Sequence, residues 1–244
     1  MSRLRSLAVR ILPPGIRRRL RSWRRRGSAP PVGRVRLGDL ARTRPISSDW
    51  GFERGTPIDR YLIEKFLEQH ANDIHGRVLE VAGDAYTRRF GHDVTEVEIL
   101  AVSERERAAT IVADLADAPQ IPDGRFDCVI VTQTLQYIWD VREAVATLRR
   151  ILAPGGVALV SLPSVIRYDD GSWPDLWRFT PASARRLFED AFGTEHIEVE
   201  APGNVLAAAA FLYGLAAEEL DGSVLQADDP AVPVSILIRA RKAE

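Results

Sequence analysis

The fold of this 244-residue chain is decided by the stretch from Phe126 to Leu162, which reads FDCVIVTQTLQYIWDVREAVATLRRILAPGGVALVSL. Its two ends, 126–132 and 157–162, are almost wholly apolar, and 141–152 between them has apolar residues at helical spacing. An apolar run without polar alternation is typical of a strand buried on both faces of a sheet. The stretch therefore predicts two parallel strands joined by a right-handed helical crossover.

The same alternation of helices and apolar strands continues on both sides of this stretch. Thr56 can cap a helix over 57–71, with Pro57 in its first turn. Further helices are expected over 182–192 and 204–220, the last as core packing or a dimer face. The pattern predicts an α/β fold with a doubly wound, mostly parallel seven-stranded sheet, which binds ligands at the carboxyl ends of its strands. The other strands are expected over 77–81, 97–102, 110–112, 196–200 and 234–240.

Charge and composition divide the chain into three parts. Residues 1–26 hold ten arginines and no acid, a local charge of +10, so the remaining residues carry −11 against a net charge of −1. Residues 27–49 hold two adjacent prolines and scattered Gly and Ser without periodicity, which predicts a linker. Residues 50–244 form the expected domain. The chain has two lysines against 31 arginines, a bias typical of a GC-rich bacterial genome.

The basic N-terminal extension has two open interpretations. It is either a solvated tail or a peripheral attachment to anionic lipid, with Ile16, Leu20 and Trp23 entering the interface among the arginines. Nucleic-acid binding is disfavoured, because no recognised nucleic-acid-binding module follows it. The longest apolar stretch, 205–217, is shorter than the roughly 20 residues of a membrane-spanning helix. Because the chain has a single cysteine, we expect a protein of the reducing cytoplasm, in contact with the inner face of the membrane in the second interpretation.

The cysteine and histidine residues exclude several kinds of site. Cys128 is the single cysteine, so an internal disulfide and a cysteine-rich zinc site are excluded, and we interpret it as an inert core residue. The four histidines lack the paired spacing of a metal-binding helix, and no metal is predicted. A nicotinamide-linked oxidoreductase is disfavoured, because the chain has neither G-x-G-x-x-G nor a Tyr-x-x-x-Lys pair.

The end of strand 77–81 is the first candidate site. Glu80 lies there and is followed by Ala82 and Gly83, small residues that let a ligand approach the backbone. A carboxylate at this place can accept hydrogen bonds from a ligand ammonium or from amides of the turn. By itself the segment also fits an ordinary strand-to-loop turn with a surface acid.

Two further strand ends carry polar residues at the same edge. Asp114 and Leu115 follow strand 110–112, and this Asp can either bond the exocyclic amine of an adenine or cap a loop. Thr132 and Gln133 lie where strand 126–132 ends. Because the carboxyl ends of parallel strands share one edge, we expect these residues to lie near Glu80.

Four segments in this order and spacing resemble class I S-adenosylmethionine-dependent methyltransferases. They are Val78-Leu79-Glu80-Val81, Ile111-Val112-Ala113-Asp114-Leu115, Phe126-Asp127-Cys128-Val129-Ile130 and Leu152-Ala153-Pro154-Gly155-Gly156. The resemblance covers Trp50 to Lys242 and implies a Rossmann-like methyltransferase fold. It also implies that S-adenosylmethionine is bound by Glu80, Ala82, Gly83, Asp114, Leu115, Thr132 and Gln133. Three segments resemble a bacterial subgroup associated with glycan and glycosyltransferase genes, namely Trp50-Gly51-Phe52 with Thr56-Pro57, Thr132 to Gln136, and Trp177-Arg178-Phe179-Thr180.

The sequence departs from the family pattern at its glycines. The family's first motif has three alternating glycines, and this chain has Ala82, Asp84 and Tyr86 in their places. The last two side chains crowd the place where backbone approaches the methionine part of the cofactor. The acid expected on the cofactor ribose has two candidates, Glu98 and Glu104.

The catalytic residue is unassigned by the sequence. Methyl transfer needs chiefly alignment of acceptor and methyl group, and a base only for a weak nucleophile such as an alcohol. Similar sugar methyltransferases place a His just after the fourth strand, where this chain has Gln136-Tyr137. Candidate bases elsewhere are His92, Asp169, Asp170 and Asp175.

The segment 164–180 follows the fifth strand, where this fold often builds its acceptor site. Trp177 and Arg178 are the predicted substrate-binding residues, because an aromatic face and a cation suit a sugar ring. The other interpretation is a hydrophobic plug, with Trp177 covering the core. The leading hypothesis is an O-directed methyltransferase acting on a glycan, a glycolipid precursor or another small acceptor. The alternative is a weak or inactive methyltransferase-like binding or scaffold protein in glycan assembly, which the missing glycines favour.

Overall fold

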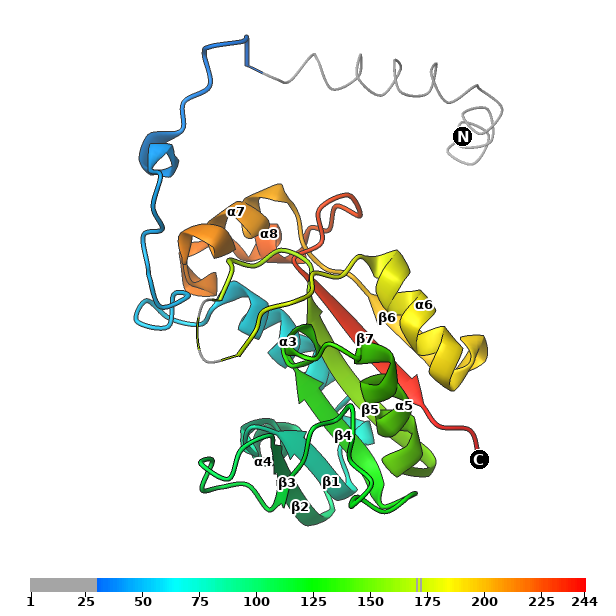
Figure 1. Cartoon of the computed structure of the whole chain (residues 1–244). Helices are drawn as coiled ribbons and strands as arrows, with labels where there is room; N and C mark the ends of the chain where they lie inside the picture. The colour runs from blue at the N-terminus through cyan, green and yellow to red at the C-terminus, as the bar shows by residue number, and fades with distance from the viewer. Residues whose placement is uncertain (1–29, 170, 172) are drawn as a thin grey trace, which may run out of the picture. The chain divides into compact units, whose positions relative to one another are not determined.

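The computed structural model describes residues 30–169, 171 and 173–244, and its seven-stranded sheet confirms the predicted fold class (Figure 1). The strand order is β3-β2-β1-β4-β5-β7-β6. Strands β2 and β3 are added on one side of β1 and strand β4 on the other, so the topological switch point lies between β1 and β4. Strands β1 to β5 pair in parallel, and β7 runs antiparallel to β5 and β6. The bounds are β1 Gly76–Val81, β2 Val94–Ala101, β3 Ile111–Val112, β4 Phe126–Thr132, β5 Leu152–Pro163, β6 Ile197–Glu200 and β7 Ser235–Arg241.

Helices cover both faces of the sheet (Figure 1). On β4, Val129 and Val131 belong to the apolar core beneath α5 and α6, while Cys128 and Ile130 belong to the core beneath α3. This burial of successive side chains on opposite faces explains why the strand sequence shows no polar alternation. The helices are α3 Ile58–Gln69, α4 Ala85–Phe90, α5 Val141–Ile151, α6 Pro181–Phe192, α7 Val205–Tyr213 and α8 Gly222–Gln226.

The predicted helix over 204–220 is too long. Helix α7 ends at Tyr213, because Gly214 adopts a left-handed φ of 72° and terminates it. A Cβ atom at Gly214 would lie 2.7 Å from the Cβ of Ser47, so glycine is needed there for space as well. The segment after Gly214 instead pairs with the start of α3 through a bridge between Pro57 and Ala216.

The predicted cap of α3 is also wrong. Pro57 occupies the N-cap position, and no side chain caps the helix. The Thr56 hydroxyl donates to Glu218 Oε1 at 2.7 Å, so it ties the start of α3 to the segment after α7. The short helices α4 and α8 were not predicted, because six and five residues are too few to show a helical period.

The chain separates into two units, Met1–Thr43 and Arg44–Glu244. In the first unit the described part contains a short 3-10 helix, Gly38–Ala41, and the arginine-rich residues 1–26 lie outside the described residues. The second unit begins before Trp50, the expected boundary. Its first residues are bound to the domain, because the amides of Ile46 and Ser47 both donate to the Tyr213 carbonyl.

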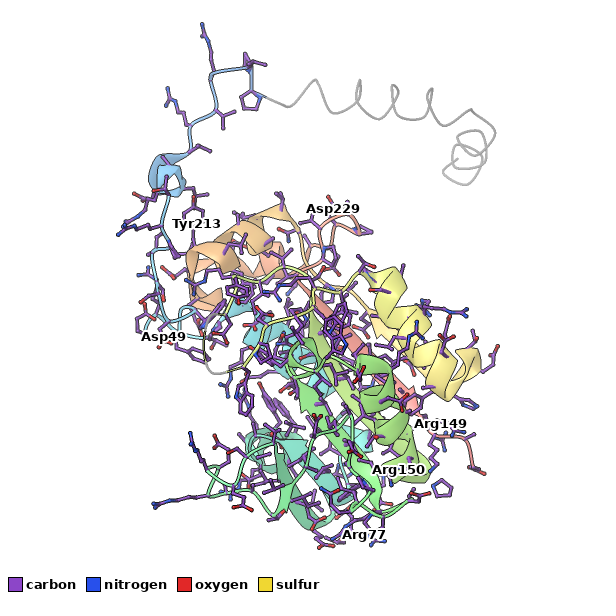
Figure 2. The ribbon with its side chains drawn as sticks, in the orientation of Figure 1. Asp49, Arg77, Arg149, Arg150, Tyr213 and Asp229 are labelled. Atoms are coloured by element: carbon purple, nitrogen blue, oxygen red, sulfur yellow. The ribbon has the colours of Figure 1, made fainter. Side chains whose placement is uncertain are left out.

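The amino edge of the sheet is held by structural contacts. Arg150 lies at the end of α5 (Figure 2). It donates to the carbonyls of Ala118 and Ile121 and pairs with Asp123. Asp127, at the start of β4, accepts from the Arg77 amide at 2.8 Å. This edge is therefore held together by structural contacts.

Candidate active site

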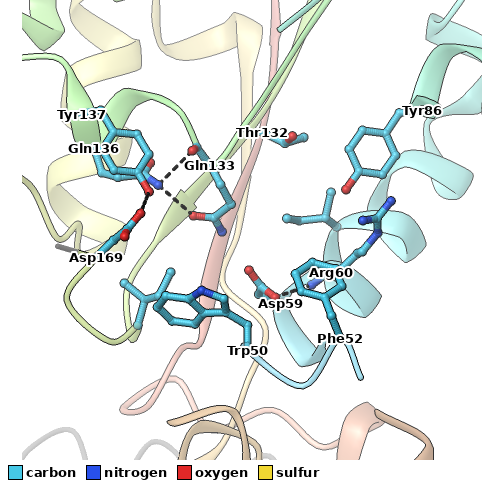
Figure 3. A pocket seen from close by; sticks show the side chains of 12 residues that line it. Trp50, Phe52, Asp59, Arg60, Tyr86, Thr132, Gln133, Gln136, Tyr137 and Asp169 are labelled. Carbon is cyan, nitrogen blue, oxygen red and sulfur yellow. Dashed lines mark hydrogen bonds between the residues drawn. The ribbon is translucent and has the colours of Figure 1, made fainter. Parts of the chain in front are cut away.

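A cavity of about 240 Å³ lies at the carboxyl ends of β1 and β4, where the strand order reverses (Figure 3). This is the place where the sequence predicts ligand binding. Its walls come from the turn before α3, from α3 and α4, from the end of β4 and from the segment after β5. The lining residues are Trp50, Phe52, Asp59, Arg60, Ile63, Tyr86, Thr132, Gln133, Gln136, Tyr137, Ile166 and Asp169.

Strained backbone gathers around the cavity. Trp50 and Gln133 line it with left-handed φ angles of 55° and 46°, and Ala82, just after β1, has a φ of 65°. Each such conformation costs a non-glycine residue roughly 1–2 kcal/mol, so the surroundings must hold it in place. The Gln133 amide donates to Ser161 Oγ at 3.0 Å, and the Arg167 guanidinium lies 4.2 Å from the Trp50 ring centre. Strain of this kind is typical of functional sites.

Glu80 holds the turn after β1. Its buried carboxylate accepts from the amides of Tyr86 and Thr87 at 3.1 and 2.8 Å, and from the Thr87 hydroxyl at 2.7 Å. Of the two roles predicted for this carboxylate, the structure shows the one with amides of the turn. Burial raises the pKa of Glu80, and the bonds to Thr87 and Tyr86 oppose that shift. Glu80, at the end of β1, thus binds the amides at the start of α4.

Two of the positions where the family motif has glycine, Asp84 and Tyr86, have different surroundings. Asp84 turns away into an ion pair with Arg88 at 2.6 Å, while Tyr86 lines the cavity. Burial raises the pKa of Tyr86 to about 12, so the phenol stays protonated at neutral pH. Gly83 is open, because a Cβ atom there would meet nothing within 4 Å. The loop after β1 therefore has open space beside Gly83, whereas the Tyr86 side chain occupies space at the cavity wall.

Gln133 and Gln136 form a polar network at the end of β4. Gln136 is 1 % exposed, and its Nε2 donates to the Gln133 carbonyl at 2.9 Å. Within the described part of the chain, Gln136 Oε1 is buried without a hydrogen-bond partner. Thr132 and Gln133 both line the cavity, as expected for residues at this strand end.

The residues predicted for the adenosine end lie on the neighbouring strands. Asp114 is exposed after β3, and its Oδ1 accepts from the Ala116 amide at 2.9 Å, whereas Leu115 is buried in the core. Of the two ribose candidates, Glu98 lies within β2 and pairs at 2.8 Å with Arg125, which precedes β4. Glu104 is exposed in the loop after β2, so it is the candidate at the ligand edge.

Of the three candidate bases that the structure describes, Asp169 reaches the cavity. Asp169 lines it and accepts from the Tyr137 hydroxyl at 3.1 Å. His92 lies before β2 with its ring against His75, at the other edge of the sheet. Arg178 lowers the pKa of Asp175 by a bidentate pair, and Asp170 lies outside the described residues.

Trp177 and Arg178 have structural contacts. The Trp177 indole donates to the Ile138 carbonyl at 2.9 Å and packs against the main core, as expected for a plug. Arg178 pairs with Asp175 and donates to the Arg167 carbonyl at 3.1 Å, which closes the loop between them. Neither residue lines the cavity, and their role in acceptor binding stays a prediction.

Sequence analysis missed Asp59, Arg60 and Trp50 as site residues. Asp59 points into the cavity from the first turn of α3 (Figure 3). Burial raises its pKa to about 6, and the bond from the Arg60 amide opposes the shift. Acidic residues are common in the first turn of a helix, so the sequence does not mark Asp59 as a site residue. Its position in the cavity wall does.

Asp59→Asn is expected to stabilise the fold at alkaline pH. The ionised Asp59 is disfavoured in the folded state, because its pKa is about 6 there against 3.8 ordinarily. The wild type therefore loses stability as the pH rises from about 4 to about 6, by about 1–3 kcal/mol. Asparagine avoids this cost, so thermal melting should be higher for the variant at pH 8 and equal at pH 4. A lower melting temperature at pH 8 would contradict the role of burial.

Comparison with known proteins agrees with the fold. A family model described as "Methyltransferase domain" matches residues 74–160. A curated probable S-adenosylmethionine-dependent methyltransferase of Mycolicibacterium smegmatis is 33% identical over 93 residues, which are 38% of this chain and 36% of that protein. The aligned region thus spans about a third of the relative's length.

Two solved structures share the architecture. The [4+2]-cyclase SpnF matches with a TM-score of 0.50 and 19% identity over 85% of this chain and 91% of that one. A SAM-dependent methyltransferase from Archaeoglobus fulgidus matches with a TM-score of 0.50 and 13% identity over 75% and 94%. At identities this low, the structural similarity shows a shared fold and does not show which reaction the chain catalyses.

The described residues offer neither a membrane span nor a metal cluster. None of the helices they form has the length and hydropathy to span a bilayer, and they contain no group of three potential metal ligands. The strand order, the site at its switch point and the matched segment converge on one assignment. Residues 74–160 match the methyltransferase-domain family model, and the sheet that contains them has the Rossmann-like fold of methyltransferases.

Proposed function

We propose that the chain transfers a methyl group from S-adenosylmethionine to a hydroxyl group of a glycan or glycolipid precursor. The observation that carries the proposal is the cavity at the switch point, which gathers residues from β4, α3 and α4 around one space. The matched methyltransferase segment favours this enzyme over the scaffold protein that the missing glycines suggested.

The residues at this edge fit the cofactor. The methionine end carries a sulfonium and an ammonium, and the cavity supplies the Asp59 carboxylate and the aromatic rings of Trp50 and Tyr86. The exposed Asp114 leaves one carboxylate oxygen for an adenine amine. The open space at Gly83 leaves room for a ligand between these two ends.

The chain's own contribution is alignment and a base. S-adenosylmethionine, when bound, supplies an electrophilic methyl group. Asp169 lies in the cavity wall, where its carboxylate can take the proton from an acceptor hydroxyl. The Tyr137 hydroxyl bonded to Asp169 orients this carboxylate. Burial and the nearby Asp169 raise the pKa of Tyr137 to about 12, so Tyr137 remains a donor.

Exposed aromatic side chains support a sugar-containing acceptor. Tyr168 is 71% exposed and adjoins Asp169, and Trp173 is 49% exposed on the same segment. Trp139, 68% exposed, lies against the plug residue Trp177 with ring centres 5.5 Å apart. Exposed aromatic rings suit the C–H faces of sugars.

The test is methyl transfer to a panel of acceptors. The full chain is incubated with S-adenosylmethionine and with glycosides, amines or carboxylic acids, and S-adenosylhomocysteine release and product masses are followed. We expect glycosides to gain the mass of one methylene group. Methylation of amines alone would contradict the acceptor class, and no transfer to any class would contradict the activity.

We also propose that the arginine-rich residues 1–26 attach the chain to anionic membranes. Ten arginines without an acid attract an anionic surface, and the acidic remainder of the chain is repelled by it. The full chain should sediment with phosphatidylserine vesicles at low salt and be released by high salt. A version that begins at Arg44 should stay in solution. Equal sedimentation of both versions would contradict the attachment.

A further inference from the structure

Asp59 and Arg60 place a carboxylate and a guanidinium cation next to each other on the cavity wall (Figure 3). We propose that these two side chains bind the methionine end of S-adenosylmethionine, Asp59 its ammonium group and Arg60 its carboxylate. The inference rests on the proposed function, because it assigns a subsite for the same cofactor. It gives α3 a binding role that lies outside the motifs of the sheet.

The other carboxylates near the cavity accept a hydrogen bond on each of their two oxygens. Glu80 uses both oxygens on the start of α4. Asp169 accepts from the Tyr137 hydroxyl on Oδ2 and from the Gly171 amide on Oδ1. Asp59 accepts from the Arg60 amide at 2.7 Å on Oδ1, and no other described residue donates to its Oδ2. Asp59 therefore has an oxygen that no other described residue occupies and that a cation can use.

Arg60 is held in place but keeps donors for a ligand. Its Nε donates to Glu64 Oε1 at 3.1 Å, and its guanidinium lies 5.6 Å from the Tyr86 ring centre and 5.9 Å from that of Phe52. Glu64 also pairs with Arg89 at 2.7 Å, so one acid is shared by two arginines. The terminal nitrogens of Arg60 can therefore bind a ligand carboxylate in a fork geometry.

Gln136 gives an independent reason to expect a donor in this cavity. Its Oε1 is buried and has no partner among the described residues, although the side chain lines the cavity. A buried acceptor without a partner costs free energy, which a ligand donor recovers. An ammonium group carries three donors, so one that is bound to Asp59 keeps donors for further acceptors of the cavity.

The ionisation of Asp59 makes binding depend on pH. The charged or titratable groups around the same cavity are Arg60 and Glu64 on α3, Tyr86 on α4, Tyr137 after β4 and Asp169 after β5. Since burial raises the pKa of Asp59 to about 6, its carboxylate is half protonated near that pH. Binding of the ammonium requires the ionised form, so affinity should fall by up to about tenfold per pH unit below 6.

Calorimetric titration of the full chain tests the inference. S-adenosylhomocysteine carries the amino acid end without the sulfonium charge, and methylthioadenosine lacks that end. We expect Asp59→Asn to weaken S-adenosylhomocysteine binding about 10- to 100-fold and Arg60→Gln to weaken it similarly. Methylthioadenosine should bind equally to wild type and both variants. Asp49→Asn, an exposed change outside the cavity lining, is the matched control and should leave both affinities unchanged.

The pH series and the variants separate failure of the subsite from failure of the proposed function. Wild-type affinity for S-adenosylhomocysteine should fall between pH 7 and pH 5, and the Asp59→Asn variant should show no such fall. Wild-type affinity in Asp59→Asn at pH 7 would overturn the subsite while leaving the proposed function intact. Binding of neither ligand by the wild type would overturn the proposed function itself.

Discussion

Asp169→Asn is expected to lower the rate of methyl transfer to a hydroxyl acceptor by about 10²- to 10⁴-fold. An asparagine at this position keeps the size of the side chain and an oxygen for the Tyr137 hydroxyl bond, now 3.1 Å, but it cannot accept a proton. The affinity for S-adenosylhomocysteine should stay unchanged, because Asp59 and not Asp169 binds the amino acid end. Single-turnover rates at saturating cofactor measure the effect.

The control for this variant is Asp49→Asn, which changes the same residue type outside the cavity. It should transfer methyl groups at the wild-type rate. A rate for Asp169→Asn within a few-fold of wild type would show that the carboxylate is not the base. Loss of cofactor binding in the same variant would instead assign Asp169 to the cofactor subsite.

Glu80→Ala is expected to destabilise the domain strongly. The change removes three hydrogen bonds to the start of α4 and leaves their donors unsatisfied beside the core. We expect a net loss of about 2–4 kcal/mol, since burial of the carboxylate offsets part of what these bonds contribute. At roughly 2–4 °C per kcal/mol for a domain of this size, melting should fall by about 5–15 °C.

The conservative variant Glu80→Gln serves as an intermediate for comparison with Glu80→Ala. Its amide keeps one oxygen acceptor of the two, so it should melt between wild type and Glu80→Ala. Calorimetric melting of the three proteins at neutral pH makes the comparison. Equal melting temperatures for wild type and Glu80→Ala would show that the turn is held by other contacts.

The sheet could be predicted because its strands are buried on both faces. Residues 126–132 and 157–162 carry a nearly continuous apolar signal, and the structure places them as neighbouring parallel strands. The helix over 204–220 was predicted too long because its apolar sequence continues past Gly214, where the left-handed φ ends α7. Apolar composition marks burial, and it does not by itself mark where a helix stops.

The site could be predicted only on the sheet side. Thr132 and Gln133 follow from the end of a strand, whereas Asp59 and Trp50 reach the cavity from before the first strand. Their positions depend on how α3 packs across the sheet, which a local pattern does not contain. For Glu80 the sequence left two roles open, and the short helix α4, which the sequence did not show, supplies the amides that decide between them.

We expect the cavity at the ends of β1 and β4 to hold the methionine end of S-adenosylmethionine. Native mass spectrometry of the full chain, titrated with S-adenosylhomocysteine, tests it most directly. We predict a saturable complex of one ligand per chain, which is weakened in Asp59→Asn and unchanged in Asp49→Asn. A spectrum that shows only the free chain at every ligand concentration would contradict the claim.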